Sequence, residues 1–191
     1  MRVELARSAG FCYGVRRAVE LAEQAARSGQ PCAMLGPIIH NSSVIDYLKE
    51  QGVALVQTPE EVPAGTAVII RSHGEGRAVH QALAERGCPV IDATCPNVSR
   101  IHRIVEEAEG EGRQVLIIGM PDHPEVEAIA GWCAHPVVLE GKTALTQWLE
   151  EDQKRREMPI TMVSQTTSTH FIWTECVKKA KKECTNLKIF D

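Results

Sequence analysis

Two cysteines of this 191-residue chain directly precede predicted helices, a position in which a thiol can be chemically active. Cys12 follows Phe11 in the glycine-flanked segment 10–14, and Cys95 lies immediately before Pro96. The first turn of a helix presents unpaired backbone N–H groups and the positive end of the helix dipole, and both stabilise a thiolate. Because a thiolate binds metals and attacks electrophiles, we predict a metal-binding or nucleophilic role for both residues. Their position leaves packing as small apolar side chains open as the alternative.

Three of the seven histidines follow predicted strands, at the corners that lead into helices. They are His40 in the sequence IHN, His73 in SHG and His123 in HPE. Imidazoles combined with helix N-terminal N–H groups favour an anion, most naturally a phosphate or a diphosphate. We therefore predict that these three histidines bind such an anion. The other four are predicted to be ordinary packed or exposed side chains: His80, His102, His135 and His170.

A carboxyl and a group of polar side chains accompany the histidine corners. Glu125 lies two residues after His123, where it either complements the helix dipole or moves protons beside a bound anion. Residues 165–168 (QTTS) end a predicted strand with an amide and hydroxyls, among them Thr166. Such a segment suits the positioning of a polar substrate and equally the capping of the next helix. Both pairs of interpretations stay open at this point.

Short apolar or β-branched runs alternate with helical patterns along the chain, which predicts an α/β fold with parallel sheets. Strands are predicted at residues 3–6, 32–35, 53–56, 67–71, 90–92, 114–119, 137–139, 160–164 and 187–190. Helices are predicted at residues 15–28, 43–51, 77–86, 96–109, from 124 onward, 143–156 and 169–184. Ligands of open α/β sheets bind at the carboxyl ends of the strands, and the marked cysteines and histidines fall there.

The alternation divides near Cys95 and Pro96 into two similar small α/β domains, each with a parallel sheet of about four strands. The first, residues 1–95, carries the N-terminal loop with Cys12. The second comprises residues 96–191. A length of 191 residues suits two domains of this size better than three.

Composition narrows the class of protein further. A hydrophobic content of 43% with 24% charged residues is typical of a soluble globular protein, and a net charge of −4 argues against binding to nucleic acid. No apolar run reaches the length of a membrane span, and the N-terminus lacks a signal or transit pattern. Seven cysteines without a CxxC pair fit a reducing cytoplasm, where cysteines pack, bind metals or react.

Taken together, six segments resemble the 4-hydroxy-3-methylbut-2-enyl diphosphate reductase family in order and spacing. They are residues 10–15 (GFCYGV), 39–41 (IHN), 72–74 (SHG), 92–96 (DATCP), 123–127 (HPEVE) and 164–167 (SQTT). The resemblance implies a cytoplasmic iron–sulfur oxidoreductase that performs the last step of the methylerythritol phosphate route of isoprene biosynthesis. In that reaction, two electrons and two protons remove the allylic hydroxyl of the substrate, giving isopentenyl and dimethylallyl diphosphates. The family fold implied is three similar α/β domains around a [4Fe–4S] cluster that three cysteines hold.

The resemblance also implies roles for individual residues of this chain. The metal-binding pair would be Cys12 and Cys95, and the catalytic proton donor would be Glu125. Binding of the diphosphate substrate would fall to the remaining marked side chains, His40, His73, His123 and Thr166. The implied partners are the small-molecule diphosphate and an external electron donor such as ferredoxin or flavodoxin, with neither nucleic acid nor membrane.

The family pattern continues with a third cysteine ligand and a third domain beyond the position of Asp191. Cys176 and Cys184 precede that position and do not match the motif. We accordingly predict that the third domain is absent from this chain and that the chain is a truncated, inactive form without a stable cluster. Two alternatives remain: a zinc-dependent hydrolase that uses Cys12, Cys95 and a histidine, and a non-catalytic phosphate-binding module.

Overall fold

The structure, a computed structural model, describes residues 3–4, 6–7 and 9–190. The chain divides into two compact units, which are treated separately below. Unit 1 comprises residues 1–72 and 83–95, and unit 2 comprises residues 73–82 and 96–191. The sequence placed residues 73–82 in the first domain, whereas they pack with unit 2, because residues 75–77 are bonded to the chain at Gly131 and Trp132. The domain boundaries proposed from the sequence otherwise stay a prediction.

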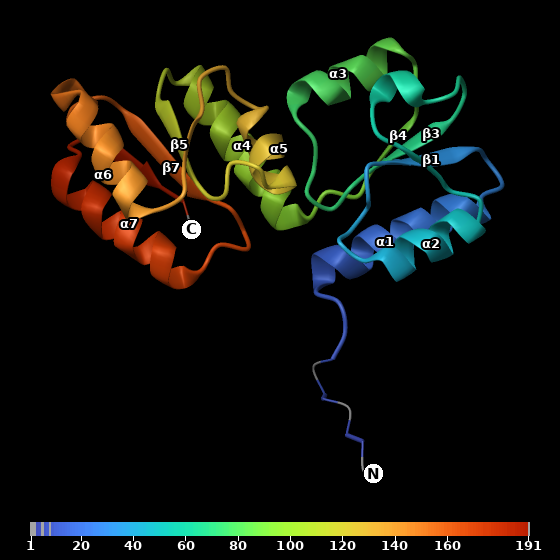
Figure 1. Cartoon of the computed structure of the whole chain (residues 1–191). Helices are drawn as coiled ribbons and strands as arrows, with labels where there is room; N and C mark the ends of the chain where they lie inside the picture. Colours follow the sequence, from blue (N-terminus) through green and yellow to red (C-terminus); the bar gives the residue numbers. More distant parts are fainter. Residues whose placement is uncertain (1–2, 5, 8, 191) are drawn as a thin grey trace. The chain divides into compact units, whose positions relative to one another are not determined.

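Unit 1 is built on a parallel sheet with the strand order β2-β1-β3-β4 (Figure 1). Its strands are β1 (Cys32–Leu35), β2 (Ala54–Val56), β3 (Ala67–Ile70) and β4 (Val90–Asp92). Its helices are α1 (Tyr13–Arg27), α2 (Ser42–Glu50) and the short 3-10 helix η1 (Pro59–Glu61). Helix α3 (Arg77–Glu85) begins in unit 2 and ends in unit 1.

Helices α1 and α2 cover one face of this sheet because their apolar residues recur at helical spacing. Ala18, Ala22 and Ala25 of α1 are buried and pack with Met34 of β1 and Leu48 of α2. Small side chains on this face let the helix approach the sheet closely. Figure 1 shows the two helices side by side beneath the strands of unit 1.

Unit 2 repeats the same topology with the strand order β6-β5-β7-β8. Its strands are β5 (Gln114–Ile118), β6 (Val137–Leu139), β7 (Ile160–Ser164) and β8 (Leu187–Ile189). Its helices are α4 (Pro96–Gly110), α5 (Pro124–Ala130), α6 (Lys142–Glu151), the 3-10 helix η2 (Gln153–Arg156) and α7 (His170–Glu183).

Strand β5 explains why the sheet of unit 2 carries helices on both faces. Leu116 and Ile118 pack into a core with α6 and α7, whereas Val115 and Ile117 point into a second core with α4 and α5. Successive side chains of a strand point to opposite faces, so a strand covered on both sides is apolar along its whole length. The continuous run at residues 114–119 therefore marks the centre of the sheet.

The predicted fold class is confirmed: each unit is a parallel four-stranded sheet with helices packed against it. Two predicted elements are wrong in part. Val3, Glu4 and Ala6 lie outside any strand, and Leu5 lies outside the described residues. The helix predicted at 143–156 is interrupted at Asp152, whose side chain accepts a hydrogen bond from the Lys154 N–H and so competes with helix continuation.

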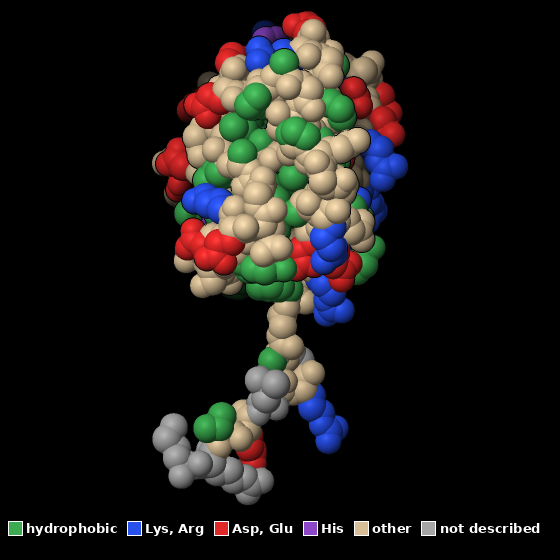
Figure 2. All heavy atoms as spheres, turned by 90° about the vertical axis from the view of Figure 1, so that its right-hand side faces the viewer, with side chains coloured by type: hydrophobic (Ala, Val, Ile, Leu, Met, Phe, Trp, Pro, Cys, Tyr) green, Lys and Arg blue, Asp and Glu red, His purple; other side chains and the backbone are tan. Residues whose placement is uncertain are grey.

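The charged side chains on the surface and the hydropathy of the helices agree with the amino-acid composition. Figure 2 shows side chains of both charge signs, interspersed with apolar ones, on the face that it draws. Within residues 3–4, 6–7 and 9–190, no helix is long and apolar enough to cross a membrane.

Candidate functional site

Glu125 and Thr166 meet at the carboxyl edge of the sheet of unit 2. Strands β5 and β7 are paired neighbours, and the chain leaves them toward Glu125 and Thr166 respectively. The Thr166 backbone N–H donates to Glu125 Oε1 at 2.5 Å, and its hydroxyl donates to Oε2 at 2.8 Å. The Glu125 side chain lies in the first turn of α5 with only 1% of its surface exposed. A carboxyl this deeply buried is retained with both of its oxygens hydrogen-bonded, as burial requires.

His123 begins α5 and faces a second histidine. Its Nδ1 accepts a hydrogen bond from the Glu125 backbone N–H at 3.1 Å, which makes it the N-cap residue of the helix. Because an accepting Nδ1 carries no proton, the proton of the neutral ring lies on Nε2, which is then a donor. The His73 ring meets the His123 ring edge to face, with centroids 5.7 Å apart. Two of the three predicted anion-binding histidines are thus adjacent.

Gln165 joins the two loops that carry these residues. Its Oε1 accepts from the Met120 N–H at 3.1 Å, and its Nε2 donates to the Thr167 hydroxyl at 2.7 Å. Gly119 permits this approach, since a Cβ there would lie 3.0 Å from Gln165 Oε1 and 2.7 Å from a methyl group of Val126. Sequence reasoning singled out residues 165–168 as polar but missed this link. A glycine directly after a buried strand was the available signal.

A cavity of about 380 Å³ adjoins Thr166 within unit 2. Thr166, Ser168 and Arg100 contribute polar groups to its wall, and Trp173 and Phe190 contribute apolar surface. A volume of this size and a wall of this mixed kind are typical of small-molecule sites. The Glu125–Thr166 pair therefore lies beside a cavity that a small polar ligand can enter.

In unit 1, Cys12 and Cys95 lie at the same end of helix α1. Cys12 is the N-cap residue, and its side chain makes no capping hydrogen bond. A Cβ on Gly14, in the first turn, would lie 2.6 Å from Cys95 Sγ, so the Cys95 thiol rests on that turn. The first turn of α1 also carries no acidic side chain. Both thiols thus lie at a helix N-terminus that no carboxylate of its own first turn complements.

Arg17 holds the loop before Cys95 against α1. Its guanidinium donates to the carbonyl oxygens of Thr94 and Asp92, both at 3.2 Å. Cys95 is tied in turn to the loop that follows strand β3 through its own N–H, which donates to Ser72 O at 2.9 Å. The sequence did not indicate Arg17, because its partners are 75 and 77 residues away along the chain.

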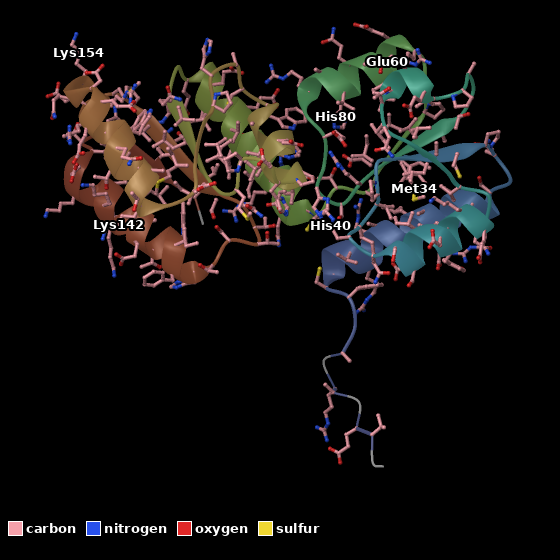
Figure 3. The ribbon with its side chains drawn as sticks, in the orientation of Figure 1. Met34, His40, Glu60, His80, Lys142 and Lys154 are labelled. Carbon is pink, nitrogen blue, oxygen red and sulfur yellow. The ribbon has the colours of Figure 1, made fainter. Side chains whose placement is uncertain are left out.

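His40 lies in unit 1, in the loop between β1 and α2, and is exposed (Figure 3). The seven predicted site residues therefore fall into two sets. One set, in unit 1, consists of Cys12, Cys95 and His40. The other set, in unit 2, consists of His73, His123, Glu125 and Thr166.

The other cysteines are less exposed than Cys12. Desolvation raises the pKa of Cys133 to about 11 and that of Cys176 also to about 11, which suits packed, protonated thiols. Within the described part of the chain, no group of three or more His, Cys, Asp or Glu side chains is arranged to hold a metal ion. Cys12 and Cys95 consequently form a pair to which the described residues add no third ligand.

Comparison with known proteins identifies relatives along the entire chain. The family model described as LytB protein matches residues 3–191. A 4-hydroxy-3-methylbut-2-enyl diphosphate reductase of Alkaliphilus oremlandii is 36% identical over 100% of this chain and 67% of its own length. The reductase of that name from Zymomonas mobilis is 37% identical over 87% of this chain and 48% of its own length.

Solved structures agree with these relatives. A structure of (E)-4-hydroxy-3-methyl-but-2-enyl diphosphate reductase, titled the terminal enzyme of the non-mevalonate pathway, is 35% identical with a TM-score of 0.82, covering 98% of this chain and 66% of that one. The E-1-hydroxy-2-methyl-but-2-enyl-4-diphosphate reductase of Plasmodium falciparum is 25% identical with a TM-score of 0.87, covering 96% and 57%.

This chain spans about half to two-thirds of the length of these proteins, which ranges from 48% to 67%. The family match and the fold agree over that span. The chain belongs to the LytB protein family.

Proposed function

We propose that this chain provides the substrate-binding and proton-donating groups of a 4-hydroxy-3-methylbut-2-enyl diphosphate reductase. The reaction removes the allylic hydroxyl with two electrons and two protons and yields isopentenyl and dimethylallyl diphosphates. The observation that carries the proposal is the hydrogen-bonded pair of the buried Glu125 and the exposed Thr166 beside His123, in a chain of this family. Buried carboxyl groups in direct contact with a hydroxyl are suited to proton transfer.

The histidines would bind the diphosphate group of the substrate. His123 offers its Nε2–H as a donor because its Nδ1 is engaged by the helix backbone. His73 lies against that ring, so two imidazoles face one region. Hydrogen bonds from imidazoles to phosphate oxygens strengthen when the rings are protonated. His40, an exposed histidine of unit 1, is likewise proposed to be a substrate-binding residue.

Glu125 would deliver protons to the leaving hydroxyl through Thr166. The Thr166 hydroxyl donates to Glu125 Oε2, so its own oxygen has lone pairs left to accept a hydrogen bond from the substrate hydroxyl. When Glu125 Oε2 carries a proton, this hydrogen bond reverses: Oε2 donates to Thr166 Oγ, and the Thr166 hydroxyl turns its own proton toward the leaving oxygen. The Glu125 proton then passes to Thr166 Oγ while the Thr166 proton passes to the leaving oxygen, which leaves Glu125 ionised. The adjoining cavity gives the substrate access to this hydroxyl.

Cys12 and Cys95 would hold an iron–sulfur cluster in part. The first turn of α1, which carries no acidic side chain, favours an anionic group at these thiols, and the missing Cβ of Gly14 leaves room for Cys95 Sγ on that turn. A [4Fe–4S] cluster, when bound, supplies the electrons and a Lewis-acidic iron for the substrate oxygen. An external donor such as ferredoxin or flavodoxin would reduce it, in a reducing cytoplasm. Since the described residues place only two thiols, those of Cys12 and Cys95, at the start of α1, we expect this chain by itself to hold no stable cluster and to be inactive.

Replacing Glu125 with Gln tests the proposed proton path. The amide keeps the shape of the carboxyl but cannot donate a proton, so turnover should fall by about 100-fold or more. The assay requires a form that carries the cluster, such as this chain extended with the carboxyl-terminal part of the Alkaliphilus oremlandii relative. The iron–sulfur absorption spectrum should not change.

Glu127→Gln is the matched control, because Glu127 lies in the same first turn of α5 but is exposed. It should retain normal turnover. Normal turnover in Glu125→Gln as well would remove Glu125 from the proton path. Metal analysis of the anaerobically purified extended chain distinguishes the remaining functions: iron with acid-labile sulfide supports the proposal, zinc alone supports a hydrolase, and neither metal supports a phosphate-binding module.

A further inference from the structure

We infer that Trp132 is a positioning residue that fixes His73 against His123. The consequence for diphosphate binding rests on the function proposed above, whereas the positioning itself is a property of unit 2. Trp132 follows the end of α5, and His73 begins the segment of unit 2 that leads into α3. The two residues are linked through the backbone of residues 75–77.

The indole makes a direct bond to that backbone. Trp132 Nε1 donates to the Glu75 carbonyl oxygen at 3.0 Å, and Arg77 Nη2 donates to the Trp132 carbonyl oxygen at 3.1 Å. The Arg77 backbone N–H also donates to Gly131 O at 3.2 Å. Three hydrogen bonds thus join residues 75–77 to the end of α5.

Two glycines bring the same backbones into contact. A Cβ on Gly131 would lie 2.7 Å from Gly76 Cα, and a Cβ on Gly76 would lie 3.0 Å from Gly131 Cα. Gly131 itself has φ −66°, a value that any residue adopts. The absence of a side chain at Gly131 is therefore explained by the close approach and not by a backbone turn.

The indole is held in place from its other sides. The ring of His102, which is buried, stacks on Trp132 with centroids 5.3 Å apart and an interplanar angle of 23°. The Arg77 guanidinium lies 5.8 Å from the ring centroid and pairs with Glu106 at 3.1 Å. The ring of His80, which is labelled in Figure 3, also lies near the indole, with the two ring centroids 5.7 Å apart. A ring fixed in this way can fix the atom to which its N–H donates.

Helix α5 connects the Trp132–Glu75 bond to the contact between His73 and His123. The helix has seven residues, with His123 as its N-cap and Gly131 as its C-cap. Residues 75–77 are bonded at the C-cap end, and His73 contacts His123 at the N-cap end. The short segment between His73 and Glu75 is thereby held at both ends. The His73–His123 spacing depends on the Trp132 bond, which acts on His73 through the backbone of residues 73–75.

The histidine ring signals in NMR spectra of this chain test the inference without substrate or cluster. Trp132→Phe removes the N–H donor but keeps an aromatic ring, and Trp148→Phe is the control, since Trp148 packs in the other core of unit 2. Signals of His73 and His123 are assigned with His73→Gln and His123→Gln. In Trp132→Phe, both signals and their pH titration midpoints should move, whereas those of His135 and His170 should not.

Unchanged His73 and His123 signals in a folded Trp132→Phe variant would overturn the inference. If that variant does not fold, Gly131→Ala serves instead, because its Cβ pushes on Gly76, with Gly110→Ala as control, where a Cβ meets nothing within 4 Å. Unmoved signals in Gly131→Ala would likewise overturn it. Inorganic pyrophosphate added to the wild type and to Trp132→Phe gives the consequence for binding, an expected loss of about threefold to tenfold in affinity. Moved ring signals together with normal turnover in Glu125→Gln would retain the positioning role and reject the proposed proton path.

Discussion

Individual cysteines of this chain differ in burial, and burial raises the pKa of a thiol. Desolvation raises the pKa of both Cys133 and Cys176 to about 11. At pH 8, about one such thiol in a thousand is a thiolate, which is the reactive form. Cys12 is exposed at the start of α1 and accessible to reagents. Of the two cysteines that the sequence marked, Cys12 is thus exposed and Cys95 is half-buried.

Alkylation should follow this division. At pH 8, iodoacetamide is expected to label Cys12 readily and to leave Cys133 and Cys176 unmodified in the folded chain. Because their pKa values are raised, labelling of the half-buried Cys133 and the buried Cys176 should increase only as the pH approaches 11. Peptide mass spectrometry measures the extent at each site. Labelling of Cys176 at pH 8 at the rate of Cys12 would contradict the burial argument.

Gly14 provides a test of where the Cys95 thiol lies. Glycine to alanine inside a helix normally stabilises it by about 1 kcal/mol. At Gly14, however, the added Cβ would displace Cys95 Sγ, which lies 2.6 Å from its position. Gly14→Ala should therefore lower the iron content of the extended, reconstituted chain by more than about half without lowering its stability. Gly110→Ala, which meets no atom within 4 Å, should leave the iron content unchanged.

Local pattern made part of the site predictable. The position of Cys12 directly before a helix, and the positions of Cys95, His73 and His123 in loops that follow strands, are readable from neighbouring residues. The side chains that hold them are not, because their partners are far along the chain: 77 residues for Arg17 and Thr94, 57 for Trp132 and Glu75, and 45 for Gln165 and Met120. Such contacts exist only after the sheets have formed.

The loops after β5 and β7 act as one element because Gln165 bonds both. Gln165→Leu would remove the buried amide that bonds the Met120 N–H and the Thr167 hydroxyl. The free energy of unfolding should fall by about 1–3 kcal/mol, as expected for two lost hydrogen bonds of about 0.5–1.5 kcal/mol each. Urea denaturation measures the change. Gln147→Leu, at an exposed position of α6, should shift stability by no more than about 0.5 kcal/mol; equal shifts for the two variants would contradict the role of Gln165.

The elements themselves were largely predictable from hydrophobic periodicity, and the exceptions have physical causes. Residues 3–6 have strand-like composition, but Val3, Glu4 and Ala6 pair with no described strand, and pairing is what stabilises a strand. The helical pattern at 143–156 continues past Asp152, yet that side chain bonds the backbone two residues on and interrupts the helix. The first outcome depends on strand pairing and the second on a competing hydrogen bond, and hydrophobic periodicity represents neither.

At the scale of the molecule, the two units share one topology. Each places its first and third strands side by side, so the chain departs from them in opposite directions at their carboxyl ends, where open α/β sheets bind ligands. In unit 1, the loops after β1 and β3 lead to His40 and to Ser72. In unit 2, the loops after β5 and β7 carry Glu125 and Thr166. The alternation of strands and helices predicted this repetition, whereas the transfer of residues 73–82 to unit 2 depends on the Trp132 contact.

Conversion of 4-hydroxy-3-methylbut-2-enyl diphosphate is the most direct measurement of the central claim. The chain alone and the chain extended with the carboxyl-terminal part of the Alkaliphilus oremlandii relative are reconstituted anaerobically and supplied with a one-electron reductant. We predict that the extended chain forms isopentenyl and dimethylallyl diphosphates, detected by phosphorus NMR, and that the chain alone forms neither. An extended chain that contains about four irons and yet leaves the substrate unchanged would contradict the account.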